Sequence, residues 1–173
     1  MSTYPLDQML ADQFREAMRH LAATVTIVST EADGTRYGMT ATAVTSVSME
    51  PPSILAAVNK RNWFHQHVSR KGAFCVNLLS SAHTRECEAF GGKVNYDKRF
   101  VSADWGTGLR SLPYFTRSEA SIFCVVDKTI DYGTHTIFIG LVEHIITCET
   151  IDPLIYLNGG FLKRMTEQIV HPS

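Results

Sequence analysis

The chain has 173 residues, 45% of them apolar and 19% charged, with 16 basic residues against 17 acidic ones. This composition is typical of one globular domain with a buried core, and it argues against a disordered or fibrous chain. The net charge of −1 also argues against nucleic acid as a partner, because phosphate binding requires a basic field.

The start of the chain predicts an amphipathic helix from about Leu6 to Leu21, with Asp7 as a candidate N-cap. Apolar residues recur along it at spacings of three and four and form one stripe, made of Met9, Leu10, Phe14, Ala17, Met18 and Leu21.

Strand patterns follow the helix. Thr24–Thr30 is rich in β-branched residues, and Asp33-Gly34 predicts a hairpin turn that leads into a returning strand. Ser53–Asn59 is apolar almost throughout, as expected of a strand that is covered on both sides. Later strands are expected at Ala73–Leu79, Ala120–Ile130 and His135–Thr147, the last two joined by residues 131–134.

Two short helices interrupt the strands. One is predicted over residues 62–72, ending near Gly72, and the other over Ser80–Gly92, with Ser80 or Ser81 as its cap. Strands and helices do not alternate strictly, and no G-x-G-x-x-G follows a strand, which argues against a Rossmann sheet. We therefore expect a mainly β fold with helices, built as an antiparallel barrel in a single domain of residues 1–173.

The cysteines and histidines predict no metal site. No C-x-x-C pair occurs, and Cys75, Cys124 and Cys148 lie beside apolar residues in predicted strands, so buried reduced thiols are expected. His83 and Cys87 are four apart but lack further ligands nearby. Neither a secretory signal nor an apolar run of membrane-spanning length is visible, so a cytoplasmic protein without a membrane partner is expected.

The stretch GMTATAVTSVSMEPP, residues 38–52, is the most informative segment. From Met39 to Met49 it reads as one strand with a period of two. The odd-numbered residues form an apolar face except at Thr45, and the even-numbered residues form a hydroxyl-bearing face except at Val44. Two interpretations stay open: a half-exposed antiparallel strand whose hydroxyls face water, or a platform of short donors and acceptors for a ligand.

Five blocks of the sequence together resemble the short-chain flavin reductase family, the reductase components of two-component flavin-dependent monooxygenases. They occur in the family's order, over about residues 12–161: FREAMRHLAATVTIVST, YGMTATAVTSVSMEPPSILAAVNKRN, GAFCVNLLSSAHTRECEAFGG, GTHTIFIGLVEHI and PLIYLNGGF. The resemblance implies an FMN-binding split barrel, a homodimer, and reduction of FMN or FAD by NADH or NADPH. It also implies that the reduced flavin passes to a separate monooxygenase.

The resemblance also implies where the flavin binds. In the family, the Thr/Ser strand and its neighbours hold the ring, the ribityl chain and the phosphate. Carried over to this sequence, the cofactor-binding residues are Met39, Thr40, Ala41, Thr42, Ser46, Val47, Ser48, Asn59, Lys60, Arg61, Phe74, Cys75 and Asn77, with Arg99 at the phosphate end.

His135 is the residue expected to contact the nicotinamide. The family usually has Gly-Asp-His at this point, and this chain has Gly133-Thr134-His135, so the histidine lacks its usual acidic neighbour. The resemblance of the C-terminal block implies that Tyr156 is a further cofactor-binding residue. Phe161 stands where an aromatic hydroxyl is often found, so an aromatic wall for the nicotinamide is kept without that hydroxyl. The alternative for His135 is a turn histidine without a role.

Hydride transfer between two flat rings is cofactor chemistry, for which the protein supplies position and charge. We expect Lys60 or Arg61 to stabilise negative charge on the reduced ring. Trp63 and Phe64 are expected to pack in the core or a dimer interface rather than on a flavin. Two other functions stay open: a split-barrel module that holds flavin or haem without turnover, and a relative of pyridoxamine-phosphate oxidase, which would need a basic cluster for its substrate's phosphate.

Overall fold

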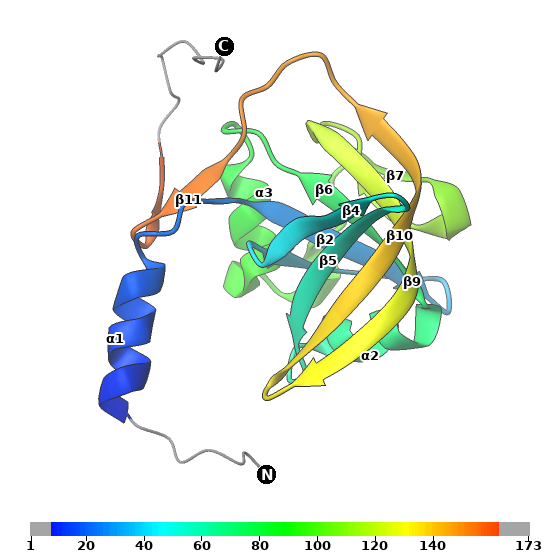
Figure 1. Ribbon diagram of the computed structural model, residues 1–173. Helices are drawn as coiled ribbons and strands as arrows, with labels where there is room; N and C mark the ends of the chain where they lie inside the picture. The colour runs from blue at the N-terminus through cyan, green and yellow to red at the C-terminus, as the bar shows by residue number, and fades with distance from the viewer. Residues whose placement is uncertain (1–7, 163–173) are drawn as a thin grey trace.

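The computed structural model describes residues 8–162, and its centre is one curled sheet of seven strands (Figure 1). Neighbouring strands are antiparallel, in the order β3-β2-β6-β9-β10-β5-β4. The prediction of a mainly β, antiparallel fold is confirmed. The strands are β2 (Thr26–Ala32), β3 (Thr35–Ala41), β4 (Val44–Met49), β5 (Pro52–Asn59), β6 (Ala73–Leu78), β9 (Ala120–Tyr132) and β10 (His135–Thr147).

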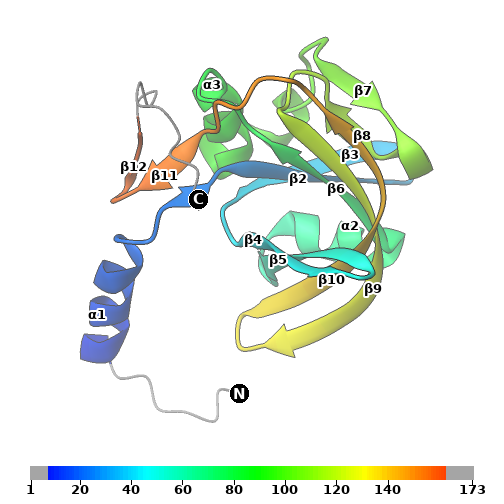
Figure 2. The ribbon, with the colours of Figure 1, turned by 45° about the horizontal axis from the view of Figure 1, so that its top comes forward.

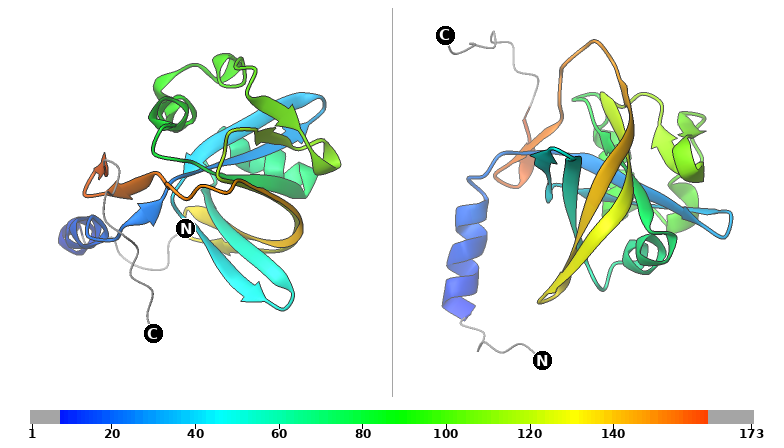
Figure 3. Two further views of the ribbon diagram at one scale, coloured as in Figure 1. Left: turned by 90° about the horizontal axis from the view of Figure 1, so that it is seen from above. Right: turned by 45° about the vertical axis from the view of Figure 1, so that its right-hand side comes forward.

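The two edge strands of this sheet, β3 and β4, are consecutive in the sequence and are joined only by Thr42 and Ala43. So short a connection holds the two edges close together, and the sheet curls into a barrel, as Figure 3 shows from above. No ladder pairs β3 with β4 among the described strands, so the barrel is split along this seam.

The expectation of one continuous strand from Met39 to Met49 is therefore wrong. The chain leaves β2 at Ala41 and joins β5 at Val44, and a bulge at Val47 shifts the register again. The period of two is lost, so that Met49 is 79% exposed, whereas Met39, on the same predicted face, is buried.

The core lies between the sheet and α2 (Trp63–Lys71), where Phe64, Phe74 and Phe138 are fully buried. Asn62 caps the helix by accepting a hydrogen bond from the Phe64 N–H at 2.9 Å. Gly72 ends it with φ of 65°, a left-handed conformation in which glycine has no steric penalty. The predicted helix of residues 62–72 is confirmed.

A second helical segment covers one face of β3. It comprises α3 (Thr84–Glu88), a π-helical turn (Ala89–Lys93) and a 3-10 turn (Tyr96–Lys98). The helix begins at Thr84 and not at Ser80 or Ser81 because both serines bond elsewhere. Ser80 forms a bridge with Pro153, and the Ser81 hydroxyl donates to Asp152 at 2.6 Å.

Several short elements were not expected from the sequence. Val25 donates to Leu154 O at 2.8 Å and interrupts the predicted strand Thr24–Thr30, so that its start joins a separate small sheet. This three-stranded sheet contains β1 (Ala23–Thr24), β11 (Ile155–Leu157) and β12 (Gly160–Phe161), and a further hairpin contains β7 (Trp105–Thr107) and β8 (Pro113–Phe115) around a 3-10 turn (Leu109–Ser111).

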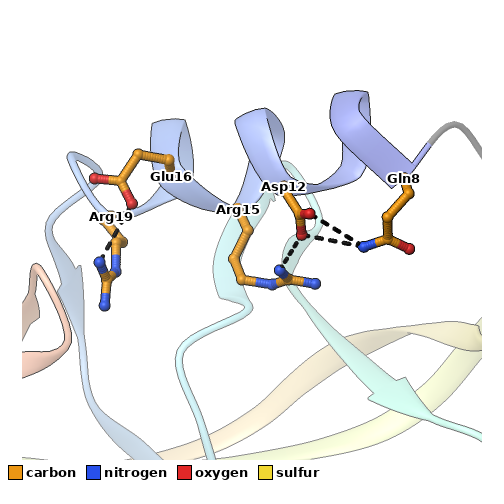
Figure 4. A network of polar contacts seen from close by, with 5 residues as sticks. All are labelled: Gln8, Asp12, Arg15, Glu16 and Arg19. Atoms are coloured by element: carbon orange, nitrogen blue, oxygen red, sulfur yellow. Dashed lines mark hydrogen bonds and ion pairs between the residues drawn. The ribbon is translucent and has the colours of Figure 1, made fainter.

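The first helix, α1 (Gln8–Met18), stands apart from the barrel (Figures 1 and 2). None of its residues is buried, and Phe14, Met18 and Leu21 are 64%, 42% and 60% exposed. Its opposite face carries a polar network of Gln8, Asp12, Arg15, Glu16 and Arg19 (Figure 4). The predicted amphipathic helix is confirmed over Gln8–Met18 and ends three residues before the predicted Leu21, and its candidate cap Asp7 lies outside the described residues.

Three of the four cysteines are buried, namely Cys75, Cys87 and Cys124, whereas Cys148 is exposed just beyond the end of β10. The expectation of a buried thiol at Cys148 is therefore wrong. Burial raises the pKa of the Cys124 thiol to about 12, which keeps it protonated and unreactive. Among the described residues, no helix combines the length and the apolar character that crossing a bilayer requires.

Candidate functional site

The end of the sheet formed by β5 and β10 brings together four of the predicted site residues. His135, the first residue of β10, lies opposite Asn59, the last residue of β5. The Lys60 N–H donates to Thr134 O at 2.9 Å, which ties the β9–β10 turn to the segment after β5. Arg61 follows, with its N–H bonded to Asn59 Oδ1 at 2.9 Å. His135, Lys60 and Arg61 are all exposed.

A chain of polar contacts fixes Lys60. Its ammonium lies 3.3 Å from Asp131 Oδ2 and donates to Gly133 O at 3.3 Å. The Thr136 hydroxyl donates to Asp131 Oδ1 at 2.6 Å, and its oxygen lies 2.8 Å from His65 Nε2. Because the Thr136 proton is used on Asp131, His65 Nε2 is the donor in its contact with the Thr136 oxygen.

These contacts also set the charge of Asp131 and leave Arg61 the freer cation. The Thr136 hydroxyl, and then Lys60, hold the pKa of the Asp131 carboxyl below its ordinary value, so this group is ionised at neutral pH. Lys60 is thereby occupied, whereas Arg61 makes no ion pair among the described residues.

His135 itself is oriented by its neighbour. Thr134 Oγ1 lies 2.9 Å from His135 Nδ1, in the place where the family usually has an aspartate. A hydroxyl can donate to or accept from the ring but brings no negative charge to stabilise an imidazolium. The contact occupies Nδ1 and leaves Nε2 for an external partner.

Arg99 directly follows the helical segment of residues 84–98 that packs on one face of β3, which we call the helical cover. Its Nη1 donates to Gly38 O at 3.1 Å, and its guanidinium carbon lies 4.4 Å from the centre of the Tyr96 ring. Its Nε is buried without a hydrogen-bond partner among the described residues, and burial lowers the pKa of the guanidinium. Arg99 also lines a cavity of about 460 Å³, whose other charged lining residues are Arg85, Glu86, Glu88, Lys93 and Lys98.

The hydroxyl residues differ in how available they are. The Thr40 hydroxyl donates to Cys87 O at 2.6 Å and so anchors α3 on β3, and the Ser48 hydroxyl bonds the Glu50 backbone at 3.0 Å. Thr42, Ser46 and Val47 are exposed along the seam and on β4. Residues 42–47 thus include side chains that are open to a ligand, whereas the hydroxyls of Thr40 and Ser48 are used in hydrogen bonds within the protein.

Five of the predicted cofactor-binding residues turn their side chains into the interior. Phe74, Cys75 and Asn77 are fully buried, and Met39 and Ala41 are 8% exposed in the core beside β2. Successive side chains of β6 point to opposite faces of the sheet, but both faces are covered, because Ala73 to Asn77 are all buried. Within this chain these side chains support the sheet and leave little or no surface for a ligand.

Tyr156 lies apart from the β9–β10 turn. It pairs with Ala23 and Phe161 in the three-stranded sheet, whose strand β11 lies beside the barrel near α1 in Figure 1. Its ring centre is 5.8 Å from that of Phe161, so the two predicted aromatic residues of the C-terminal block do lie together.

Asp131 and Tyr96 belong to the site but were not expected from the sequence. The position of Asp131 could have been predicted from the sequence, because a two-residue turn at Gly133-Thr134 places Tyr132 opposite His135 and Asp131 opposite Thr136. Tyr96, whose hydroxyl contacts Gly38 N at 3.2 Å, had no local signal, since 58 residues separate the two.

The residues present fit a flavin. Thr42, Ser46 and Val47 are exposed along the seam and on β4 and offer a surface for a flat ring, and Arg61 is an exposed cation just beyond the end of β5. The buried, unpartnered Nε of Arg99 indicates a guanidinium whose environment is completed by an external anion such as a phosphate. Fold and site together thus define a flavin-binding split barrel.

Comparison with known proteins gives the family. The family model described as "Flavin reductase like domain" matches residues 18–163, and the chain belongs to this family. The family resemblance seen in the sequence is confirmed.

Relatives and solved structures agree over nearly the whole chain. The reductase component of the FADH(2)-dependent resorcinol hydroxylase of Rhizobium sp. (strain MTP-10005) is 39% identical over 154 residues, covering 88% of this chain and 86% of that protein. The FMN reductase (NADH) RutF of Stutzerimonas stutzeri (strain A1501) is 34% identical, covering 88% of each. The structure of the flavin reductase PheA2 in its native state superimposes with a TM-score of 0.81 at 29% identity, covering 94% of this chain and 100% of that one.

Proposed function

We propose that this protein reduces FMN or FAD with NADH or NADPH and passes the reduced flavin to a separate monooxygenase. The named relatives support the activity, since one is an FMN reductase (NADH) and another is the reductase component of an FADH(2)-dependent hydroxylase. The observation that carries the proposal within this chain is the convergence of His135, Asn59 and Arg61 at one end of the split barrel.

Bound flavin supplies a ring that accepts a hydride from a reduced nicotinamide. The chain's own residues hold and orient the two ligands. His135, fixed at Nδ1 by Thr134, presents Nε2 to the nicotinamide amide, and Arg61 supplies positive charge just beyond the end of β5. Asp131 keeps Lys60 on the β9–β10 turn, so Lys60 acts by holding this turn in place.

At the phosphate end, we assign the flavin phosphate to Arg99. Its buried Nε has no hydrogen-bond partner among the described residues, and its Nη1 is anchored on Gly38 O. Thr42, Ser46 and Val47 would contact the ring through backbone and hydroxyl groups along the seam.

A homodimer and a cytoplasmic location complete the proposal. The apolar stripe of α1 supports the dimer, because Phe14 and Met18 are exposed and no described part of the chain packs over them. The relatives' names support the monooxygenase as a separate partner. The cytoplasmic location stays a prediction from the sequence, to be tested by cell fractionation.

The activity is tested by mixing the purified protein with NADH or NADPH and excess FMN or FAD without oxygen. We expect flavin-dependent loss of nicotinamide absorbance and bleaching of the flavin. His135→Ala should lower the rate while flavin affinity is kept, and Arg99→Ala should weaken flavin binding with a smaller effect on the rate at saturation. A protein that binds flavin but oxidises neither nicotinamide would be a binding module, and the proposal would be rejected.

A further inference from the structure

We propose that Trp63 and Arg61 form a platform for the adenosine diphosphate half of a dinucleotide, either NADH or FAD. This inference rests on the proposed function and extends its site beyond the flavin and nicotinamide rings. The platform consists of the Trp63 indole, which would stack on adenine, and the Arg61 guanidinium, which would bind the pyrophosphate.

The first observation is an exposed indole backed by other aromatic rings. Trp63 is 61% exposed, although its chain neighbour Phe64 is fully buried. Its ring centre lies 5.9 Å from that of Tyr96 and 6.4 Å from that of His67, and the His67 ring stacks on Tyr37 at 3.5 Å. These rings hold the indole from behind, so its exposed surface is a prepared site for another flat ring.

The second observation is a cavity with cations at the same place. A hollow of about 330 Å³ is lined by Lys60, Arg61, Asn62, Trp63 and Gln66. It contains no acidic side chain in its lining, and Arg61 makes no ion pair among the described residues. A planar guanidinium of this kind binds phosphate oxygens in a bidentate manner.

The third observation is the position of this cavity relative to the proposed nicotinamide site. Asn59 lies opposite His135, and the Lys60 N–H bonds Thr134 O at 2.9 Å, so the cavity begins one residue from the β5–β10 contact. A dinucleotide whose nicotinamide contacts His135 can therefore run its pyrophosphate across Arg61 and bring its adenine to Trp63. An FAD molecule with its ring at the seam can reach the same cavity with its own adenosine.

Kinetics with truncated substrates tests the platform and distinguishes the two sources. With FMN as the flavin, Trp63→Ala should raise the KM for NADH by about 5- to 140-fold, the range expected from losing one stacked base. It should leave the KM for reduced nicotinamide mononucleotide, which lacks the adenosine, within twofold. With the mononucleotide as donor, a rise in the KM for FAD but not for FMN would identify FAD as the occupant.

Control variants separate the platform from general damage. Trp63→Phe keeps an aromatic ring and should stay close to the parent protein. Arg61→Ala should raise the KM for the dinucleotide, whereas Arg70→Ala, which removes the same charge from the far end of α2, should not. Equal effects of Trp63→Ala on dinucleotide and mononucleotide, or no effect on either dinucleotide, would overturn the proposal.

A binding measurement makes the test independent of activity. The chain has two tryptophans, and Trp105 is buried, so quenching of tryptophan fluorescence by ADP-ribose should come from Trp63. We expect saturable quenching in the parent protein and none in Trp63→Phe. Quenching that persists in Trp63→Phe would place the ligand beside Trp105 instead and overturn the platform. If ADP-ribose quenched the Trp63 fluorescence saturably in a protein without reductase activity, the proposed function would be rejected and the binding site would stand.

Discussion

Asn77 shows at the scale of one residue how a predicted cofactor-binding side chain is used inside the fold. Its Nδ2 donates to Ile27 O at 2.9 Å and Ser29 Oγ at 3.0 Å, and its Oδ1 accepts from Phe115 N at 2.8 Å and Ser121 Oγ at 2.9 Å. These bonds connect β2, β6, β8 and β9 in the fully buried interior. Asparagine is needed here because it donates and accepts at once.

Asn77→Ala should therefore lower the free energy of unfolding by about 3–5 kcal/mol, because the buried Phe115 N–H and its neighbours lose their partner. Ser121→Ala, which removes its own bond to Asn77 Oδ1, should cost about 1 kcal/mol. Urea unfolding measures both. Flavin affinity per folded molecule should be unchanged in Asn77→Ala, and a large loss of affinity would instead support direct contact with the cofactor.

Asp131 gives a residue-scale prediction about pH. Its pKa in the folded protein is lowered, chiefly by the Thr136 hydroxyl and then by Lys60. A carboxyl with a depressed folded pKa contributes stability above its unfolded pKa of about 3.9, and this contribution is lost as the pH falls through the folded pKa. Asp131→Asn keeps an oxygen acceptor for Thr136 but loses the attraction to Lys60.

The difference in melting temperature between the parent protein and Asp131→Asn should thus be positive at pH 7 and shrink towards zero in acid. The effect should be small, because both partners are exposed and solvent screens the pair. Repeating the comparison with Lys60→Met in both proteins should reduce the difference and leave the part that comes from the Thr136 hydroxyl. A difference that grows as the pH falls below 4 would contradict the sign of the pKa shift.

At the scale of elements, Gly38 is the point where the helical cover meets β3. A Cβ at this position would lie 2.7 Å from Phe90 Cε1 and 3.1 Å from Phe100 Cζ. The absence of a side chain allows both rings to rest on the strand, and the Gly38 carbonyl also accepts from Arg99. Close packing of the cover therefore depends on this glycine.

Gly38→Ala should push the cover off β3 and lower the free energy of unfolding by about 1–3 kcal/mol, as expected for overpacking. Because Arg99 is anchored on the same carbonyl, flavin binding should weaken as well. Gly91→Ala is the matched control, since its Cβ would meet nothing closer than Thr40 Oγ1 at 4.0 Å. Equal stability of the two variants in urea would show that the cover tolerates the methyl group.

Elements whose chemistry is local were predictable from the sequence, and elements fixed by distant contacts were not. Helix α2 follows from Asn62 and Gly72, which act within their own turns. The seam at Thr42-Ala43 has no local breaker, because neither residue is glycine or proline, and it exists because β3 pairs with β2 while β4 pairs with β5. For the same reason the sequence predicted His135 beside a turn but not Tyr96 beside Gly38.

At the scale of the whole molecule, the described chain contains a helix that its own barrel does not bury. An isolated helix of 11 residues is only marginally stable in water, so α1 needs a partner surface to persist. Its polar face is already satisfied by the network around Asp12, while Phe14 and Met18 lie exposed on the other face. A second copy of the chain, as proposed above, would cover this stripe.

Phe14→Glu should therefore convert the dimer into a monomer, because it places a charge in the apolar interface. Light scattering after size-exclusion chromatography measures this as a fall from about twice 19.3 kDa to about 19.3 kDa at micromolar concentration. Gln8→Glu makes the same change of charge on the polar face shown in Figure 4 and should remain dimeric. Far-ultraviolet circular dichroism should show less helix in the Phe14→Glu monomer, since α1 loses its support. A parent protein that runs as a monomer at tens of micromolar, or a Phe14→Glu variant that stays dimeric, would show that the stripe of α1 is not the subunit contact.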